Sequence, residues 1–395
     1  MKKPIIVQKF GGTSVGSIER MHVVAEHIIK AKNDGNHVVV VVSAMSGETN
    51  RLINLALEVD DVPNARELDV LLSAGEQMSM ALLAMILSKL GYSTTSLTGS
   101  QAKILTDNHH NNAAIKHIDT GPITELLNDE QIVIVAGFQG INSKGDITTL
   151  GRGGSDTSAV TLAGALEAQE CQIFTDVDGI YTCDPRVVKN ARKIDCIDFP
   201  AMKEMARKGA KVLHLPSVLY AHQYNVPLRV LSTFEVNDGS LVSGDSSERL
   251  ISGLALEHCL VMIHVEHSTS EALQKQCQML GIEIWSVIQE TDWTGVVIKQ
   301  DAYAKLGLVF DEKIRNSEAV SLLTVVGTQA QRVLSASIEL LLDHGIDVHH
   351  HFTEQRSLML VLCPTVVEKA ANILHDAYIT EHETELFQQN QMHFG

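Results

Sequence analysis

Residues 5–42, IIVQKFGGTSVGSIERMHVVAEHIIKAKNDGNHVVVVV, decide the fold, because an apolar run, a glycine turn, an amphipathic segment and a valine run follow one another. We expect a strand at Ile5–Gln8 and a helix at Ser17–Lys32, where apolar residues recur at helical spacing. The continuous valines of Val38–Val42 are typical of a strand that is buried on both faces. This order predicts an open, mostly parallel sheet with helices on both of its faces.

The same alternation continues to about residue 245. Gln131–Gly137 and Gln172–Asp176 are further short apolar runs that predict buried strands. A polar stretch with two glycines, residues 237–249, then indicates a linker.

Beyond the linker, the sequence predicts two copies of a βαββαβ-like unit with little identity between them. In each copy the first helix is followed by a glycine and an alternating strand, at Gly281 and at Gly345. Glycine at a helix C-terminus explains both junctions. The predicted elements are strands at 259–266, 282–289, 295–299, 320–326, 346–352 and 357–362, and helices at 269–280, 329–343 and 364–378.

Composition excludes several classes of protein. The formal net charge of −17 argues against a nucleic-acid-binding protein, which needs a basic surface. The six cysteines form no CxxC pair, so the sequence predicts neither a disulfide framework nor a zinc site. The N-terminal apolar run is too short for a signal peptide or a membrane span, and we expect a cytoplasmic protein without membrane contact.

Lys9 precedes Gly11 and Gly12 in a turn between a strand and a helix. Glycines at such a turn let backbone N–H groups approach phosphates, and the helix N-terminus adds positive potential. A Walker A loop is excluded because there the lysine follows the glycines. The alternative interpretation is a tight turn with a surface lysine.

A second glycine-rich loop, residues 151–158 (GRGGSDTS), opens a helix of small residues. Arg152 suits bidentate binding of a substrate carboxylate. Asp156 is expected either to orient Lys9 or to hold Mg²⁺. We favour a functional loop, because a structural loop has little use for an arginine between glycines.

Polar residues also follow other predicted strands. Thr175 and Asp176 end a strand where open α/β sheets bind ligands, and Tyr181 and Arg186 are then placed to cover an adenine and reach its phosphates. Lys211 adds another cation. Glu76, at the start of a very apolar segment, is explained equally well by the helix dipole.

Together these motifs resemble those of aspartate kinases, which belong to the amino-acid-kinase superfamily. Six motifs occur in the family's order and spacing: KFGGTSV (9–15), SAMSGETN (43–50), GE (75–76), GRGGSDTSA (151–159), FTDVDGIYTCDPR (174–186) and GAKVLH (209–214). The resemblance implies a three-layer αβα kinase domain over residues 1–245. It also implies two ferredoxin-like (ACT) units, the first formed by 251–315 with 380–395 and the second by 316–379.

The implied reaction is the transfer of phosphate from ATP, with Mg²⁺, to L-aspartate, as the first step toward lysine, threonine and methionine. The β-carboxylate of aspartate has a pKa of about 3.9, so it is already ionised and needs no general base. Catalysis then requires positioning and charge neutralisation. The resemblance assigns Lys9 and Asp156 to catalysis, Thr49, Glu76, Arg152 and Ser155 to aspartate, and Lys9, Phe10, Gly11, Gly12, Ser43, Thr175, Asp176, Tyr181, Arg186, Lys211 and Val212 to ATP.

The regulatory half departs from the family's pattern. Family effector sites carry a Pro-Gly-Val sequence at the start of the helix and an asparagine after the Gly-Ile turn, whereas Glu283 and Asp347 stand at the latter position here. A carboxylate there would repel an effector's α-carboxylate by about 1–4 kcal/mol. We predict that inhibition by lysine or threonine is weakened, altered or absent.

Two alternative functions remain at this point. One is a related kinase acting on glutamate, acetylglutamate or UMP, and the other is a catalytically silent amino-acid sensor. The three histidines His349–His351 are discounted as a metal site, since only two of them share a face of a strand and no third ligand is evident. ACT units commonly pair edge to edge, so we expect a homodimer or a higher homo-oligomer.

Overall fold

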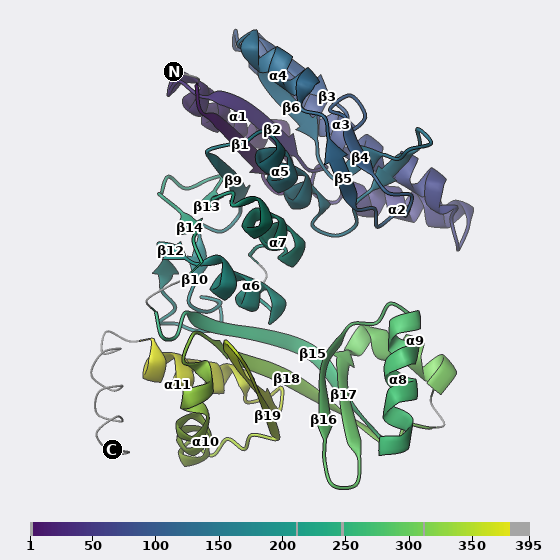
Figure 1. Ribbon diagram of the computed structural model, residues 1–395, viewed down its shortest axis with the longest axis vertical. Coiled ribbons are helices and arrows are strands. Elements are labelled where there is room, and N and C mark those ends of the chain that lie inside the picture. The colour runs from purple at the N-terminus through teal and green to yellow at the C-terminus, as the bar shows by residue number, and fades with distance from the viewer. Residues whose placement is uncertain (1–2, 211, 246–248, 311–312, 380–395) are drawn as a thin grey trace. The chain divides into compact units, whose positions relative to one another are not determined.

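The computed structural model describes residues 3–210, 212–245, 249–310 and 313–379, and it divides into two compact units (Figure 1). Of the described residues, the first unit comprises 3–180, 193–203 and 212–245. The second comprises 181–192, 204–210, 249–310 and 313–379. Two short segments, 181–192 and 204–210, therefore belong to the second unit although residues of the first unit flank them in the sequence.

An eight-stranded sheet with the order β12-β14-β13-β9-β1-β2-β6-β3 organises the first unit. All of its pairs are parallel except β13 with β14. The strands are β1 (Ile5–Phe10), β2 (His37–Val42), β3 (Thr94–Leu97), β6 (Ile132–Ala136), β9 (Glu170–Thr175), β12 (Cys196–Ile197), β13 (Leu228–Ser232) and β14 (Ser240–Val242). Every residue of β1 and β2 is buried, as the valine run predicts.

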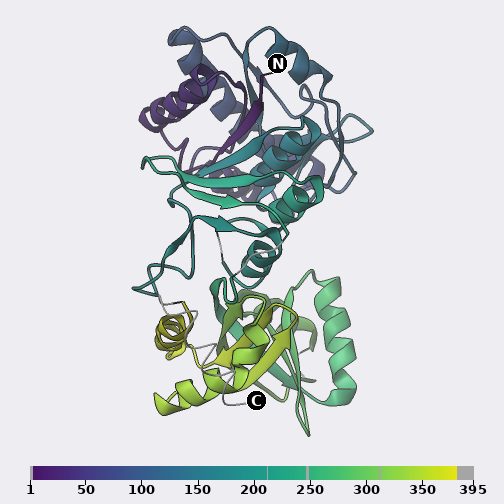
Figure 2. The same cartoon turned by 60° about the vertical axis from the view of Figure 1, so that its left-hand side comes forward.

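Helices cover both faces of this sheet (Figures 1 and 2). α1 (Ile18–Asn33) and α3 (Ala65–Lys89) share a core with the alternate residues Val38, Val40 and Val42. α5 (Gly154–Ala165) contacts β1, β2 and β9, and it packs against α7 (Leu215–Tyr224). This α/β architecture confirms the predicted fold class.

The elements before residue 210 that lie outside the eight-stranded sheet include a second, smaller sheet. A second, four-stranded sheet has the order β5-β4-β7-β8 and lies beside α3, which contacts β8. Its strands are β4 (Ile104–Thr106), β5 (Ile115–Ile118), β7 (Gln139–Ile141) and β8 (Ile147–Thr149). The other elements are α2 (Glu48–Val59), α4 (Gly121–Asn128), α6 (Phe199–Arg207), β10 (Ile180–Tyr181) and β11 (Lys193–Ile194).

By length and composition, α3 is apolar enough to cross a membrane, but half of its most apolar window is buried inside the protein. Its buried positions include the charged residues Asp69 and Glu76 as well as Leu83 and Leu87. This pattern is that of the core helix of a globular unit, because the buried carboxylates have polar partners in the same unit.

The second unit is built on one antiparallel six-stranded sheet with the order β16-β17-β15-β18-β20-β19. The long strands β15 and β18 pair at its centre, and the helices pack on its two halves through separate apolar cores. The strands are β15 (Gly253–Val265), β16 (Ile284–Gln289), β17 (Thr294–Lys299), β18 (Asn316–Val326), β19 (His350–Glu354) and β20 (Ser357–Leu362). The helices are α8 (His267–Met279), α9 (Gln300–Phe310), α10 (Leu334–Asp343) and α11 (Val367–Tyr378), with a 3-10 turn, η2 (Ala330–Val333).

The predicted glycine junctions are confirmed, since Gly281 and Gly345 have φ of +66° and +71° and follow α8 and α10. Other predicted elements need correction. The expected linker at 237–249 contains β14, which pairs with β13. The helix predicted at 329–343 begins as the 3-10 turn η2, and β19 begins at His350, so His349 lies outside it. The segment 380–395, predicted to complete the first ACT unit, lies outside the described residues.

Candidate active site

Two glycine-rich loops meet at the side chain of Lys9. Lys9 is on β1 and buried, and its Nζ lies 2.6 Å from Oδ1 of Asp156 in the first turn of α5. A Cβ on Gly11 would lie 3.5 Å from the same Nζ, so the ammonium stands directly over the glycine turn. The contact between Lys9 and Asp156 is the one expected if Asp156 orients the lysine.

Close backbone approach explains the glycines of this region. A Cβ on Gly12 would lie 2.9 Å from the carbonyl oxygen of Ala44, and the N–H of Ser46 donates to the carbonyl of Gly12 at 3.1 Å. A Cβ on Gly137 would lie 2.9 Å from the side chain of Ser155. The loops after β1, β2 and β6 and the start of α5 therefore gather at one edge of the sheet, where the N-terminal end of α5 favours a phosphate group.

Glu76 brings a buried carboxylate to the loop that follows β2. Its Oε1 accepts a hydrogen bond from the N–H of Ala44 at 3.1 Å, whereas its Oε2 has no hydrogen-bond partner among the described residues. Burial raises the pKa of the Glu76 carboxyl to about 7, against the effect of the Ala44 hydrogen bond. Complementing the helix dipole does not explain this position, because Glu76 is in the middle of α3 and not at its start.

The other predicted aspartate ligands lie in the same unit. Ser155 is buried at the start of α5, and Thr49 is half-buried in the first turn of α2. Arg152 is exposed and makes no ion pair within the described part of the chain. Its guanidinium is therefore accessible to an anionic group.

His214 is a neighbour of the second glycine-rich loop that sequence reasoning did not single out. Gly153 has φ of +68°, and a Cβ there would lie 2.2 Å from the imidazole ring of His214. The ring's Nδ1 is buried without a hydrogen-bond partner in the described residues. The only sequence signal was its place at the end of the GAKVLH motif.

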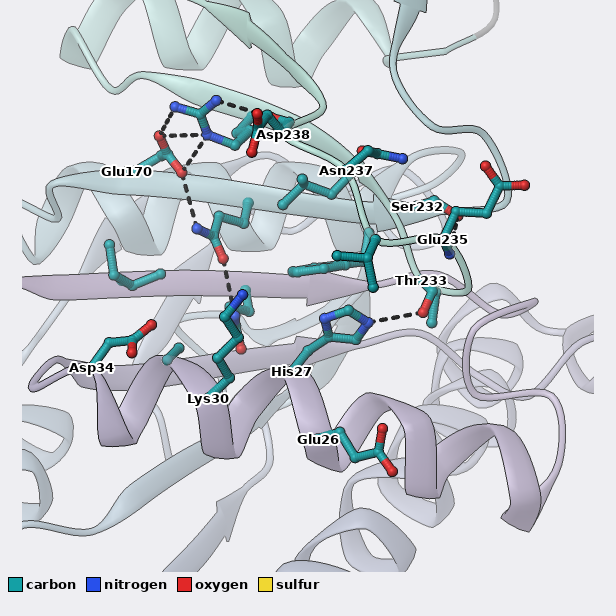
Figure 3. A pocket seen from close by; sticks show the side chains of 18 of the residues that line it. Glu26, His27, Lys30, Asp34, Glu170, Ser232, Thr233, Glu235, Asn237 and Asp238 are labelled. Atoms are coloured by element: carbon teal, nitrogen blue, oxygen red, sulfur yellow. Dashed lines mark hydrogen bonds and ion pairs between the residues drawn. The ribbon is translucent and has the colours of Figure 1, made fainter.

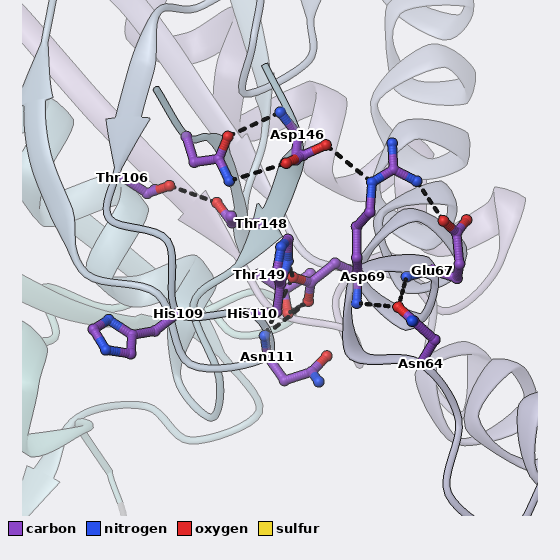
Figure 4. Close-up of polar contacts among 12 residues, drawn as sticks. Asn64, Glu67, Asp69, Thr106, His109, His110, Asn111, Asp146, Thr148 and Thr149 are labelled. Atoms are coloured by element: carbon purple, nitrogen blue, oxygen red, sulfur yellow. Dashed lines mark hydrogen bonds and ion pairs between the residues drawn. The ribbon is translucent and has the colours of Figure 1, made fainter. Parts of the chain in front are cut away.

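Sequence reasoning also missed Asp69, which anchors the segment that leads into this loop (Figure 4). Asp69 is fully buried in α3 and accepts hydrogen bonds from Nδ1 of His110 at 2.6 Å, the N–H of Asn111 at 3.0 Å and the hydroxyl of Thr149 at 2.5 Å. Thr149 ends β8, two residues before Gly151. The available signal was a carboxylate surrounded by leucines in residues 68–72.

The predicted nucleotide ligands are divided between the two units. Ser43, Thr175, Asp176 and Val212 lie in the first unit, together with Lys9–Gly12. Ser43 donates its N–H to the carbonyl of Phe10 at 3.1 Å, and the Thr175 hydroxyl donates to Asp176 at 3.0 Å.

Three other predicted nucleotide ligands lie outside the described part of the first unit. Tyr181 and Arg186 belong to the second unit, where Arg186 pairs with Asp184 at 2.7 Å. Lys211 lies outside the described residues. Their contribution to ATP binding stays a prediction.

The described residues contain no cluster of three or more histidine, cysteine, aspartate or glutamate side chains that could hold a metal ion. Asp156, the candidate ligand for Mg²⁺, is paired with Lys9. A magnesium ion at this site would therefore depend on oxygen atoms of a bound nucleotide.

Comparisons with known proteins agree on one family. Residues 4–232 match the model of the amino acid kinase family. The chain is 44% identical to an aspartate kinase of Pseudomonas putida, covering 95% of this chain and 97% of that one. It is 41% identical to an aspartokinase of Geobacillus stearothermophilus over the same shares.

Solved structures give the same result for the fold. Aspartokinase III of E. coli in complex with aspartate and ADP (R-state) matches with a TM-score of 0.78 and 25% identity, covering 95% of this chain and all of that one. The same enzyme in complex with lysine and aspartate (T-state) matches with a TM-score of 0.79, covering 94% of this chain and 99% of that one.

Proposed function

We propose a residue-level mechanism from the premise that this chain belongs to the amino acid kinase family and, within it, to the aspartate kinases. The chain phosphorylates aspartate with ATP. In this reaction a β-carboxylate oxygen forms a bond to the γ-phosphorus while the bond between that phosphorus and the β,γ-bridging oxygen breaks, and ADP leaves. Two anions must approach each other, so the site must supply positive charge where they meet.

Lys9 supplies that charge to the transferring phosphoryl group, and Asp156 fixes the direction of its side chain. The supporting observation is the 2.6 Å contact between Nζ of the buried Lys9 and Oδ1 of the half-buried Asp156, which come from distant parts of the sequence. The N-terminal end of α5 adds to the positive potential. Phosphate oxygens of the bound nucleotide would hold Mg²⁺, which would add positive charge where the two anions meet.

Glu76 and Arg152 recognise the two charged groups of aspartate that do not react. The unpaired Oε2 of Glu76 offers a buried acceptor for the α-ammonium group, and the exposed guanidinium of Arg152 suits the α-carboxylate. Thr49 and Ser155 hold the remaining substrate oxygens. This arrangement selects an amino acid over a nucleoside monophosphate such as UMP.

Replacing Lys9 with alanine tests the mechanism. We expect kcat to fall by about a hundredfold or more with little change in the KM for aspartate, since the lost interaction belongs to the transition state. Release of ADP and trapping of the acyl phosphate by hydroxylamine measure the rate. Lys144→Ala, which removes an exposed lysine of the same unit, serves as the control.

Equal turnover of Lys9→Ala and wild type would refute the proposed role of Lys9. No turnover by the wild type with any carboxylate substrate would instead favour the amino-acid sensor.

We also propose that the enzyme acts in the cytoplasm, as the first step toward lysine, threonine and methionine. Its second unit would act as a pair of ACT units that mediate regulation and self-association. The repeated order of β15, α8, β16 and β17 in β18, α10, β19 and β20 supports this assignment. The exposed carboxylates Glu283 and Asp347, at matching places in the two copies, support a weakened response to amino-acid effectors.

A further inference from the structure

A cavity of about 780 Å³ lies in the first unit, between α1, strands β1, β9 and β13, and the segment 233–238 (Figure 3). It opens on the face of the sheet opposite to Lys9, because Gln8 lines it and successive strand residues point to opposite faces. Its size is that of a small-molecule site. Among the described residues, none of those assigned to aspartate or ATP lines it.

A chain of polar side chains crosses the floor of this cavity. Gln8 donates to Gln172 at 2.9 Å, Gln172 donates to Glu170 at 3.0 Å, and Arg229 donates to both oxygens of Glu170 at 3.0 Å. Gln8 is only 2% exposed, and its Oε1 has no hydrogen-bond partner among the described residues. A buried acceptor without a partner is costly, and a ligand that donates a hydrogen bond there would remove the cost.

The charges around the opening favour a cation. Carboxylates lie on both sides of the opening (Figure 3). On one side are Glu26 of α1 and Asp34, the C-cap of α1, with Lys30 between them. On the other side are Glu235 and Asp238, beyond β13. The guanidinium of Arg229 is neutralised by its ion pair with Glu170. The apolar side chains of Phe174, Leu231 and Val236 also line the cavity and would pack against an aliphatic chain.

We propose that this cavity is a second binding site, specific for a small organic cation that carries amino or guanidino groups on an aliphatic stem. The rim carboxylates would bind the charged group, and the stem would lie over the apolar side chains. A donor atom of the ligand would then reach the Gln8 oxygen. This proposal is independent of the mechanism of phosphate transfer.

The residues that line the cavity contact the turn after Lys9 at two points, Gly11 and Ser14. The Nε2 of His27 donates to the carbonyl of Thr233 at 2.8 Å, and the Thr233 hydroxyl bonds the buried hydroxyl of Ser14 at 2.6 Å. The carbonyl of Phe174, which lines the cavity, accepts the N–H of Gly11 at 3.3 Å. A bound cation would therefore restrict the motion of the phosphate-binding turn at Gly11 and at Ser14. We expect this restriction to change the KM for ATP.

Calorimetry on the full chain, without ATP or aspartate and at constant ionic strength, tests the site with 1,5-diaminopentane as the probe. We expect saturable binding with one cation per chain, and no binding of glutarate, which has the same length and opposite charge. The double variant Glu235→Lys/Asp238→Lys should weaken binding at least about tenfold, because it reverses two rim charges. Glu58→Lys, on the exposed side of α2, should bind as the wild type does.

Absence of saturable binding up to about 10 mM, a concentration that still detects millimolar affinity, would overturn the proposal. Equal affinity of the double variant and the wild type would also overturn it, since the cation would then be bound elsewhere. Because no turnover is measured, either result is separate from a failure of the catalytic assignments. A change in the KM for ATP that the double variant abolishes would support the link to the phosphate-binding turn.

Discussion

At the scale of single residues, Glu76 should make the binding of aspartate depend on pH. Its carboxyl has a pKa of about 7, well above the ordinary value of 4.5, because it is buried. Only the ionised form attracts the α-ammonium group of aspartate. We therefore expect the KM for aspartate to be about tenfold higher at pH 6 than at pH 8, where most of the carboxyl is charged.

Initial rates over a range of aspartate concentrations, taken from pH 6 to pH 8, measure this dependence. Glu76→Gln should show a high KM that changes little with pH, since the amide does not titrate. Asp61→Asn, an exposed carboxylate of the same unit, should keep the wild-type dependence. The same pH dependence in Glu76→Gln would assign the titration to another group.

The raised pKa of Glu76 also affects the free energy of unfolding. The folded protein holds this proton more tightly than the unfolded chain does, so the carboxyl lowers the stability as pH rises from 4.5 toward about 7. Glu76→Gln removes this contribution. We expect the variant to be more stable relative to wild type at pH 8 than at pH 5, as urea unfolding would show.

At the scale of elements, Asp69 joins α3 to β8 and to the 107–112 segment (Figure 4). Asp69→Ala would leave the Asn111 N–H, the Thr149 hydroxyl and His110 without their common acceptor. We expect a loss of about 2–4 kcal/mol in the free energy of unfolding, as for other buried polar networks. Because Thr149 leads directly into Gly151 and Arg152, the KM for aspartate should rise as well.

Asp69→Asn separates structural damage from positioning. The amide keeps one acceptor oxygen, so the fold should be retained, while the KM for aspartate should still increase because the Thr149 hydroxyl is held less firmly. Chemical unfolding and steady-state kinetics on the same preparations give both quantities. An unchanged KM in both variants would show that the 150–154 loop does not depend on this network.

The elements also show what the sequence could and could not predict. Periodicity placed β1, β2, β6 and β9 within a few residues, because strands buried on both faces carry an unbroken apolar signal. It missed β14, whose three residues lie between polar turns and are held by pairing with β13. The contact between Lys9 and Asp156 was expected as one of two roles for Asp156, and the family resemblance favoured it. The Asp69 network and the cavity between α1 and the sheet depend instead on long-range packing that no local pattern records.

At the scale of the whole molecule, an eight-stranded sheet organises the unit that carries Lys9, and a separate six-stranded sheet organises the unit that contains the repeat. The two matching junctions, Gly281-Ile282-Glu283 and Gly345-Ile346-Asp347, place an exposed carboxylate directly after a positive-φ glycine and a buried isoleucine. If the second unit binds amino acids as ACT units do, both carboxylates would face the ligand's own α-carboxylate. The wild-type enzyme should then respond weakly to lysine and threonine.

Removing the two carboxylates tests this repulsion directly. We expect Glu283→Asn/Asp347→Asn to lower the lysine or threonine concentration that gives half-maximal inhibition by about tenfold, because about 1.4 kcal/mol of repulsion is removed. Asp301→Asn, an exposed acid on α9, is the matched control and should leave the response unchanged. Strong inhibition of the wild type at submillimolar lysine would contradict the argument, since these carboxylates would then be compatible with effector binding.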